Sequence, residues 1–292
     1  MIRNLKNAPW YIWAYRRKER LKRFFRHDIP LELHTWRMAM KERPLLLEAR
    51  RKYEHLYRTM DNPLVSVTIA TYNRGKLLTE RTLPSVLNQT YQNFEIVIVG
   101  DCCTDDTEER IAKLNDPRIR FYNLPQRGPY PSDPTLLWYV AGVPPMNRAL
   151  DAAHGDWIAH LDDDDEWKTY HLEYTLEVAY EKNTELVGST MLVEFPPEVW
   201  RPFVPRAKLT RLPSVSYRGV APHSSLVMRS YLKLFRYDVR CWQLKAAGDQ
   251  HLLMRMAHCG VRYQPLTILT VLQPLRPGTT RQGYRAEDRV NL

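Results

Sequence analysis

Four consecutive aspartates and a glutamate, Asp162–Glu166, directly follow the hydrophobic segment Trp157–Leu161. Carboxylates repel one another when they are crowded or buried, so a positive group is expected among them. A divalent cation suits this place because Mg²⁺ and Mn²⁺ prefer oxygen ligands, and Mg²⁺ often completes its coordination shell with substrate phosphates. The run therefore predicts a Mn²⁺ or Mg²⁺ site for a nucleotide phosphate; the alternative is a solvated acidic loop.

Two other polar groups follow strand-like segments in the same way. Thr71-Tyr72-Asn73-Arg74 follows the β-branched run Val65–Ala70, and an acidic stretch beginning at Asp101 follows Phe94–Gly100. Segments with helical periodicity separate these runs, and they cover residues 76–89, 105–115 and 146–154. Alternating strands and helices predict an α/β fold with a mostly parallel sheet, in which ligands bind beyond the carboxyl ends of the strands.

The positive charge is concentrated at the N-terminus. The chain has 292 residues and a formal net charge of +10, and residues 1–60 hold 16 Lys and Arg against six Asp and Glu. A basic arm on a neutral body differs from a basic groove across a domain, so no nucleic-acid partner is expected. No apolar stretch reaches the roughly 18–20 residues of a membrane span, and no leader peptide is recognisable. We expect a soluble, cytoplasmic protein.

The four cysteines are Cys102, Cys103, Cys241 and Cys259, and they lack the CxxC spacing. This pattern predicts free thiols in a reducing compartment and argues against a disulfide framework or a zinc site.

The basic arm has aromatic residues at helical spacing, among them Trp10, Trp13, Phe24 and Phe25. One interpretation is an amphipathic helix over residues 9–26 that lies on an anionic membrane, at the inner face of the cell membrane. The other is a helix that packs on the main domain. We expect a helical extension over residues 1–62, a domain over residues 63–275, and a tail or lid over residues 276–292.

Several motifs occur in a fixed order along the chain. They are Val65–Asn73, Ser85–Tyr91, Glu95–Asp101, Asn147–Asp156 leading into Leu161–Trp167, and Ala247–Met256. Together they resemble the family 2 glycosyltransferases of the GT-A fold, strongly over residues 64–170. The resemblance implies a GT-A domain, with a Rossmann-like nucleotide-binding half, behind the basic helical extension.

The resemblance also assigns roles to residues. It implies that Thr71, Tyr72, Asn73 and Asp101 line the nucleotide, and that Asp162 and Asp164 form the DxD element, with Asp164 ligating the metal and Asp162 contacting the ribose or metal-bound water. Asp249 would be the general base of an inverting transfer; its alternative role is a helix N-cap. Many relatives have an arginine immediately before Asn147, where this chain has Met146, and Arg148 is the candidate substitute.

The acceptor side is less specified by the sequence. Trp167 is a candidate for stacking on a sugar or for the core, His223 for the cleft or a structural role, and Arg281 for a lid over phosphates or a tail. A Pro-rich loop over residues 126–134 is expected beside the cleft or as a surface excursion.

The resemblance implies a metal-dependent inverting glycosyltransferase with a nucleotide-sugar donor, expected to be a UDP-sugar, and a glycan, lipid-linked or protein acceptor. One alternative is a sugar nucleotidyltransferase. Another is a catalytically inactive GT-A module that binds anionic lipid or nucleic acid through its arm.

Overall fold

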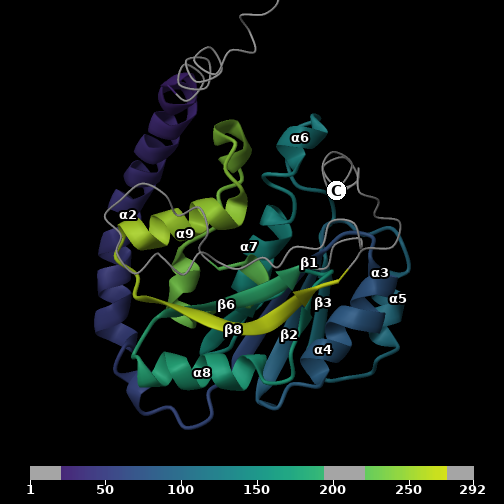
Figure 1. Ribbon diagram of the computed structural model, residues 1–292. Coiled ribbons are helices and arrows are strands. Elements are labelled where there is room, and N and C mark those ends of the chain that lie inside the picture. The colour runs from purple at the N-terminus through teal and green to yellow at the C-terminus, as the bar shows by residue number, and fades with distance from the viewer. Residues whose placement is uncertain (1–20, 194–220, 275–292) are drawn as a thin grey trace, which may run out of the picture.

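The computed structural model describes residues 21–193 and 221–274. Within them, eight strands form one mixed sheet with the order β3-β2-β1-β4-β7-β6-β8-β5. In Figure 1, α4 and α8 lie below this sheet, and α7 and α9 lie above it. The strands are β1 (Val65–Thr71), β2 (Phe94–Gly100), β3 (Ile119–Asn123), β4 (Trp157–His160), β5 (Glu166–Trp167), β6 (Leu186–Val193), β7 (Leu226–Arg229) and β8 (Tyr263–Gln273).

Helices and short turns connect these strands. The helices are α2 (Ile29–Tyr53), α3 (Gly75–Leu77), α4 (Leu83–Leu87), α5 (Thr107–Ala112), α6 (Pro134–Leu137), α7 (Val143–Ala152), α8 (His171–Glu181) and α9 (Gly248–His258). Two π-helical segments are η2 (Phe24–Asp28) and η4 (Leu78–Thr82), and the 3₁₀ helices are η3 (Leu56–Arg58), η6 (His223–Ser225), η7 (Ser230–Leu234) and η8 (Cys241–Leu244). The predicted α/β class is confirmed.

Strand β1 lies at the centre of the parallel half of the sheet. It pairs in parallel with β2, from Val65 opposite Phe94 to Thr71 opposite Gly100, and on its other side in parallel with β4. The carboxyl ends of these three strands therefore meet at one edge of the sheet. The polar groups that follow them in the sequence are brought to that edge, as the pattern predicts.

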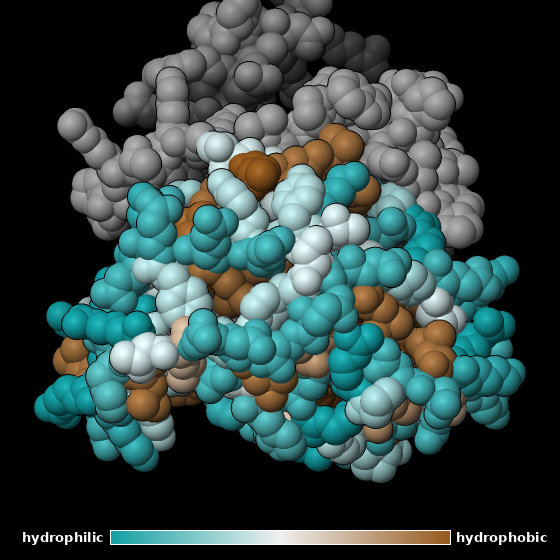
Figure 2. Space-filling model, turned by 90° about the horizontal axis from the view of Figure 1, so that it is seen from below, coloured by the Kyte–Doolittle hydropathy of each residue, from teal (hydrophilic) through white to brown (hydrophobic). Residues whose placement is uncertain are grey.

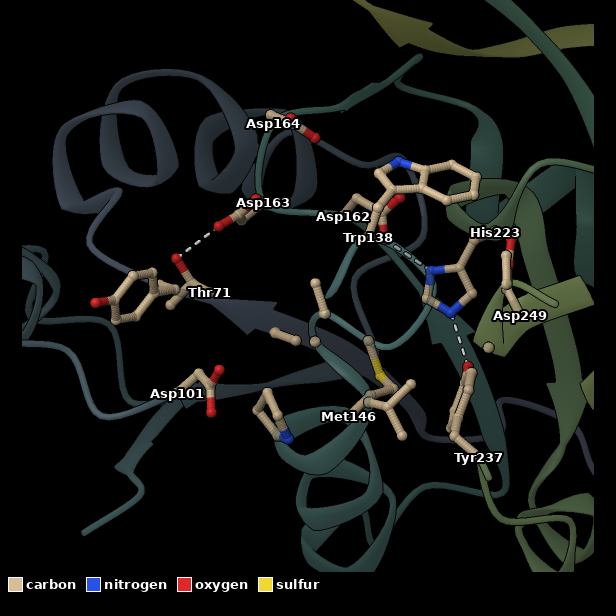
Figure 3. Close-up of a pocket in the computed structure, with 18 of the residues that line it drawn as sticks. Thr71, Asp101, Trp138, Met146, Asp162, Asp163, Asp164, His223, Tyr237 and Asp249 are labelled. Carbon is tan, nitrogen blue, oxygen red and sulfur yellow. Dashed lines mark hydrogen bonds and ion pairs between the residues drawn. The ribbon is translucent and has the colours of Figure 1, made fainter. Parts of the chain in front are cut away.

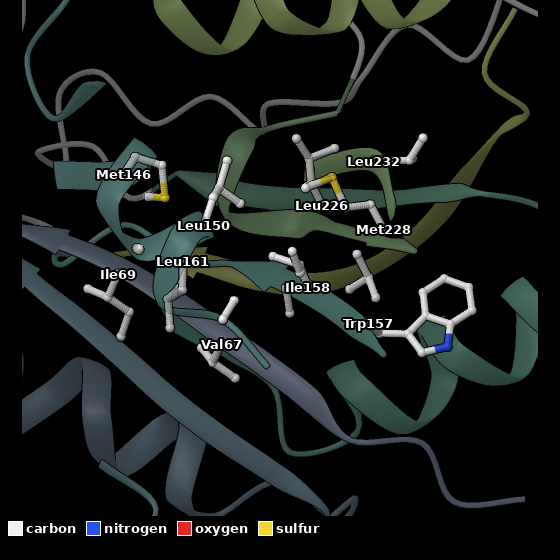
Figure 4. Packing of buried hydrophobic residues seen from close by; sticks show 14 of the residues in the cluster. Val67, Ile69, Met146, Leu150, Trp157, Ile158, Leu161, Leu226, Met228 and Leu232 are labelled. Carbon is white, nitrogen blue, oxygen red and sulfur yellow. The ribbon is translucent and has the colours of Figure 1, made fainter. Parts of the chain in front are cut away.

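The core is built on both faces of the parallel strands. Figure 4 shows Val67 and Ile69 of β1, Ile158 of β4 and Leu150 of α7 in the buried hydrophobic cluster, and all four are fully buried. The opposite face of β1 buries hydroxyl groups instead, and Thr68 bonds to the His160 ring at 2.9 Å. The sequence of a strand that is buried on both faces is a nearly continuous run of β-branched residues, which is why β1 is recognisable in the sequence.

Helix α7 begins three residues earlier than its sequence pattern indicates. Its first residue is Val143, and Pro144 and Pro145 follow in the first turn. Proline is tolerated there because the first backbone N–H groups of a helix have no partner within it. Gly142 provides the turn before the helix with a φ of 78°, which glycine adopts readily.

Helix α2 packs along the domain through one side. Leu31, Thr35, Ala39 and Leu46 are buried there at spacings of four and seven residues, and Tyr57 is buried just after the helix. Helix α2, which follows residues 9–26, therefore packs on the domain, and the two interpretations of residues 9–26 stay predictions. Trp10 and Trp13 lie outside the described residues, and Phe24 and Phe25 are exposed.

A buried carboxylate, Glu185, joins α2 to the sheet. Arg50 of α2 donates to both of its oxygens, at 2.7 and 2.5 Å, and the Tyr231 hydroxyl and the Arg262 backbone N–H donate as well. Burial alone would raise the pKa of Glu185, but the bonds from Arg50 and the other donors outweigh it and lower that pKa. The carboxylate is therefore charged and satisfied in the fold.

Replacing Glu185 with alanine should lower the free energy of unfolding by about 3–5 kcal/mol, because Arg50 would remain partly buried without its counter-charge. Glu181→Ala is the matched control, since this glutamate is exposed and pairs only with its neighbour Lys182 in the described contacts. Urea titration of both variants measures the difference. Equal stability of the two variants would refute the structural role of Glu185.

The lower face of the molecule is mostly hydrophilic, and Figure 2 shows only scattered groups of hydrophobic residues on it. Among the helices of residues 21–193 and 221–274, none combines the length and apolar character needed to cross a bilayer. All four cysteines are free thiols, as the sequence predicts. Cys102 and Cys103 are half-buried, and Cys241 and Cys259 are buried.

Candidate active site

A cleft of about 290 Å³ opens at the carboxyl edge of the parallel strands. Thr71 and Asp101 line one side of it, as Figure 3 shows, and His223 and Asp249 line the other. The turn after β4 lies between the two sides. The volume is close to the lower end of the range for small-molecule sites.

Each of the first three carboxylates of this turn has a partner. Asp163 accepts a hydrogen bond from the Thr71 hydroxyl at 2.7 Å, and Arg74 donates to Asp163 at 2.7 Å and to Asp164 at 3.1 Å. The charge of Asp163 is the main reason why the pKa of Arg74 is raised. A positive group among the carboxylates was expected from the sequence, and Arg74 supplies part of that charge.

Asp162 belongs to a hydrogen-bonded chain that crosses the cleft wall. Its Oδ1 lies 2.7 Å from Nδ1 of His223, whose Nε2 lies 2.7 Å from the Tyr237 hydroxyl. Burial opposes ionisation of both groups, but their mutual attraction outweighs it, so the pKa of Asp162 is lowered and that of His223 is raised. Asp162 is therefore held as a carboxylate in a fixed orientation.

The fourth aspartate of the run supports the turn from behind. Asp165 is fully buried, accepts bonds from Ser224 and Gln273, and has a raised pKa because of burial and of the nearby Asp162 and Asp164. The raised pKa of Asp165 therefore reflects the concentrated negative charge of the turn. Two carboxylates in such a field provide the hard oxygen donors that suit Mn²⁺ or Mg²⁺, so the residues present fit a divalent cation.

Asp249 faces the cleft from the first turn of α9. The N-cap position is Ala247, and Oδ1 of Asp249 accepts a bond from the Gln250 backbone N–H at 2.8 Å. The alternative role as a side-chain N-cap is therefore not seen. Burial raises the pKa of Asp249, and Asp162 adds to the increase, while His223 opposes it. A carboxylate with a raised pKa beside a cleft is suited to accept a proton.

The Pro-rich loop folds onto the other side of the cleft. Asp101 accepts a bond from the Tyr130 hydroxyl at 2.6 Å, and its Oδ2 lies 3.5 Å from Nε of Arg127. The Arg127 guanidinium also lies over the Tyr72 ring, 3.7 Å from its centroid. Of the two interpretations of this loop, the structure supports the one that places it beside the cleft.

Three of the described candidate residues, Asn73, Arg148 and Trp167, do not line the cleft. Asn73 adopts a φ of 51° and bonds to Thr104 through its side-chain oxygen, so it joins two loops. Arg148 is exposed and lies over the Tyr122 ring at 4.9 Å, while Met146 lines the cleft. Trp167 is buried and donates through its indole to the Ser224 carbonyl, which makes it a core residue. Arg281 lies outside the described residues.

Arg74, Arg127, Trp138 and Tyr237 line the cleft but were given no role from the sequence. Arg74 had a signal, because it ends the polar group after β1 and the acidic run needs a positive partner. Trp138 and Tyr237 had none, since the fold brings them in from segments with no recognisable motif. Trp138 is 42% exposed, whereas Trp167, the stacking candidate from the sequence, is buried.

Comparisons with known proteins agree with this geometry. The family described as "Glycosyl transferase family 2" matches residues 66–132 and 145–240, which is more than half of the chain. A relative from Escherichia coli, UDP-Glc:alpha-D-GlcNAc-diphosphoundecaprenol beta-1,3-glucosyltransferase WfaP, is 42% identical over 107 residues, covering 36% of this chain and 37% of the relative. The chain spans about two fifths of the length of the first curated relatives that it matches.

Two solved structures share the fold. TarS residues 1–349 of S. aureus in complex with UDP-GlcNAc superpose with a TM-score of 0.56 at 21% identity, over 74% of this chain and 59% of that one. The mannosyltransferase PcManGT from Pyrobaculum calidifontis, in complex with GDP-Man and Mn²⁺, gives a TM-score of 0.54 at 16% identity, over 88% of this chain and 70% of that one. With the family match, these similarities confirm the predicted GT-A fold, and the chain belongs to glycosyltransferase family 2.

Proposed function

We propose that the protein is a metal-dependent, inverting glycosyltransferase that moves a sugar from a nucleoside diphosphate donor to a lipid-linked or polysaccharide acceptor. The observation that carries this proposal is that the turn with Asp162 and Asp164 opens onto the same cleft as Asp249. The family membership argues against a sugar nucleotidyltransferase, and the retained carboxylates argue against an inactive module.

Several findings support the donor and the acceptor class. TarS binds UDP-GlcNAc, and the name of WfaP gives UDP-Glc as its donor and a diphosphoundecaprenol-linked sugar as its acceptor. We therefore propose UDP as the nucleotide and a lipid-linked acceptor. On this proposal Thr71, Tyr72 and Asp101 bind the nucleotide, with Arg127 beside them.

Transfer requires charge neutralisation at the leaving group and proton removal from the acceptor. A divalent cation held by Asp164 and Asp162 would act as a Lewis acid on the diphosphate, and PcManGT is a relative in fold that was solved with Mn²⁺. His223 holds the Asp162 carboxylate in place through a bond of 2.7 Å. Asp249 accepts the proton of the attacking hydroxyl, and attack opposite the leaving group inverts the anomeric centre. Trp138 offers an exposed aromatic face on which an acceptor sugar can stack.

The proposal is tested by incubating the chain with UDP-Glc, UDP-GlcNAc and GDP-Man in the presence of Mn²⁺. Release of the nucleoside diphosphate is then followed with and without a sugar linked to polyprenyl diphosphate. We expect one donor to be consumed faster when the acceptor is present, and EDTA to stop the reaction. No turnover of any donor under these conditions would count against the proposal.

We further propose that α2 rests on an anionic membrane surface, where lipid-linked acceptors reside. Leu33, Trp36, Met40 and Leu47 share one face of the helix and are 47–55% exposed. Exposed basic residues flank this face, among them Arg37, Lys41 and Arg43. An apolar stripe bordered by positive charge is the pattern of an interfacial helix.

Replacing both Trp36 and Met40 with serine should weaken binding to phosphatidylglycerol vesicles about tenfold, because two half-exposed apolar side chains lose their contact with lipid. Leu45→Ser is the matched control, since Leu45 is 51% exposed on the opposite side of α2. Vesicle flotation measures the difference. Deletion of residues 1–60 is a poor test, because it removes buried side chains such as Leu46. Unchanged flotation of the double variant would exclude this docking face.

A further inference from the structure

Three metal-ligating side chains meet where α2 packs against α9, away from the cleft. They are His34 of α2, His251 of α9, and Asp238, which precedes η8. Oδ2 of Asp238 lies 2.9 Å from Nε2 of His34 and 3.8 Å from Nδ1 of His251. One ligand atom of each residue lies within 4.8 Å of the others, and the two imidazole rings are 5.3 Å apart.

His251 has no hydrogen-bond partner in the described part of the chain. The residue is completely buried, and neither ring nitrogen makes a bond there. Buried polar groups are nearly always satisfied, so an orphaned imidazole that faces a carboxylate needs an explanation. Asp238 is nearly buried as well, and its other oxygen accepts a bond from the Arg240 backbone N–H at 2.9 Å. One unbonded nitrogen of His251, Nδ1, therefore lies 3.8 Å from the Asp238 carboxylate, which also contacts His34.

We propose that His34, Asp238 and His251 bind a divalent transition metal, with Zn²⁺ as the expected ion. Zn²⁺ takes nitrogen and oxygen ligands at about 2.0–2.2 Å in a tetrahedral arrangement, which separates neighbouring ligand atoms by roughly 3.3 Å. The separations of 2.9 and 3.8 Å bracket this value. Two imidazoles and one carboxylate favour zinc over Mg²⁺, which prefers oxygen ligands.

The surrounding charges are compatible with a cation. Arg255, one turn along α9 from His251, is a competing positive group, and it is paired with Glu42 of α2. The two carboxylates, Asp238 and Glu42, outnumber the single guanidinium of Arg255. His34 is 30% exposed in its side chain, so an ion has an entry route from solvent. None of the three ligands lines the cleft, which separates this metal from the one expected at Asp164.

A metal ion at these three residues would connect α2 to α9, the helix that carries the proposed base Asp249. His34 lies on α2, and His251 is two residues after Asp249 on α9. The sequence argued against zinc because its cysteines lack CxxC spacing, but His34 precedes Asp238 and His251 by more than 200 residues, so no local motif marks this set. The ion therefore links α2 to the rest of the domain. Because it binds the folded chain, it stabilises the folded state by mass action.

The test uses the full chain carrying Asp164→Asn, so that metal binding in the cleft is weakened, after treatment with EDTA. Zn²⁺ is added alone, and the bound metal is counted by mass spectrometry after gel filtration. We expect one zinc per chain and a melting temperature raised by a few degrees. With Co²⁺ in place of Zn²⁺, we expect the visible absorption of a tetrahedral site.

His34→Ala should abolish the stoichiometric zinc, the cobalt absorption and the thermal shift. His258→Ala is the matched control, because His258 also lies on α9 and also contacts a carboxylate of α2, Glu32, at 2.7 Å. Asp238→Asn is the second test, in case one variant folds poorly. Absence of stoichiometric zinc from the parent chain, or zinc retained in both His34→Ala and Asp238→Asn, would overturn the proposal. Neither result depends on whether the chain transfers sugar.

Discussion

Replacing Asp249 with asparagine should lower kcat for sugar transfer about 10³-fold and leave nucleotide binding nearly unchanged. The amide cannot accept the proton of the acceptor hydroxyl, and loss of a general base costs roughly 10²–10⁴-fold in rate. Asp249 lies across the cleft from Thr71 and Asp101, which form the proposed nucleotide side. The substitution therefore leaves the nucleotide contacts in place. Initial rates with the preferred donor and acceptor measure the effect. Gln250→Ala is the control, because Gln250 is the exposed neighbour on the same helix.

The pH dependence of the reaction follows from the environment of Asp249. Burial raises its pKa, so the carboxyl group remains protonated to a higher pH than an exposed aspartate does. The active base is present only above this pKa, and kcat/KM should therefore fall as the pH is lowered through it. His223, Asp162 and Tyr237 are the titratable groups around it. Asp249→Asn should remove this acidic limb from its residual activity; a variant with the wild-type pH profile would show that another group is the base.

Replacing Asp164 with asparagine should lower the transfer rate at least about 10²-fold, because Lewis-acid stabilisation of a diphosphate leaving group contributes several kcal/mol. The substitution removes one of the two negative charges that Arg74 contacts. A higher Mn²⁺ concentration should recover part of the activity if Asp164 is a metal ligand. The measurement is a Mn²⁺ titration of donor turnover.

Glu166→Gln provides the control for Asp164 within the same acidic run. Its carboxylate pairs with Arg81 at 2.9 Å and does not line the cleft. We expect this variant to keep its rate and its metal requirement. Equal losses in the two variants would mean that the run acts through its total charge and not through a ligand at Asp164.

The parallel half of the sheet could be predicted because its strands are buried on both faces. Val65–Ala70 and Phe94–Gly100 are therefore nearly continuous apolar or β-branched runs, and their order along the chain places three polar ends at one edge. The second half was not predicted strand by strand. Strand β7 runs antiparallel to β4, and β8 includes Pro265 and many half-buried residues, so neither has a clear pattern.

Site residues could be predicted where polar side chains directly follow a strand. Thr71, Asp101, Asp162 and Asp164 line the cleft, and so do Asp249 and His223. Their catalytic and binding roles stay predictions.

The rest of the site depends on contacts between distant segments. Arg148 lies on the exposed side of α7 while Met146 faces the cleft, and the sequence alone does not set that rotation. Trp167 is fixed in the core by its bond to Ser224, which follows it by 57 residues. Trp138 enters the cleft on a segment whose sequence has no recognisable periodicity.

Calorimetric titration of UDP, GDP, dTDP and CDP, each with and without Mn²⁺, tests the central claim most directly. The account predicts that one nucleotide, expected to be UDP, binds with Mn²⁺ and binds far more weakly without it or in Asp164→Asn. Absence of binding by all four nucleotides, or binding that neither Mn²⁺ nor the substitution changes, would contradict a metal-dependent nucleotide-sugar site in this cleft.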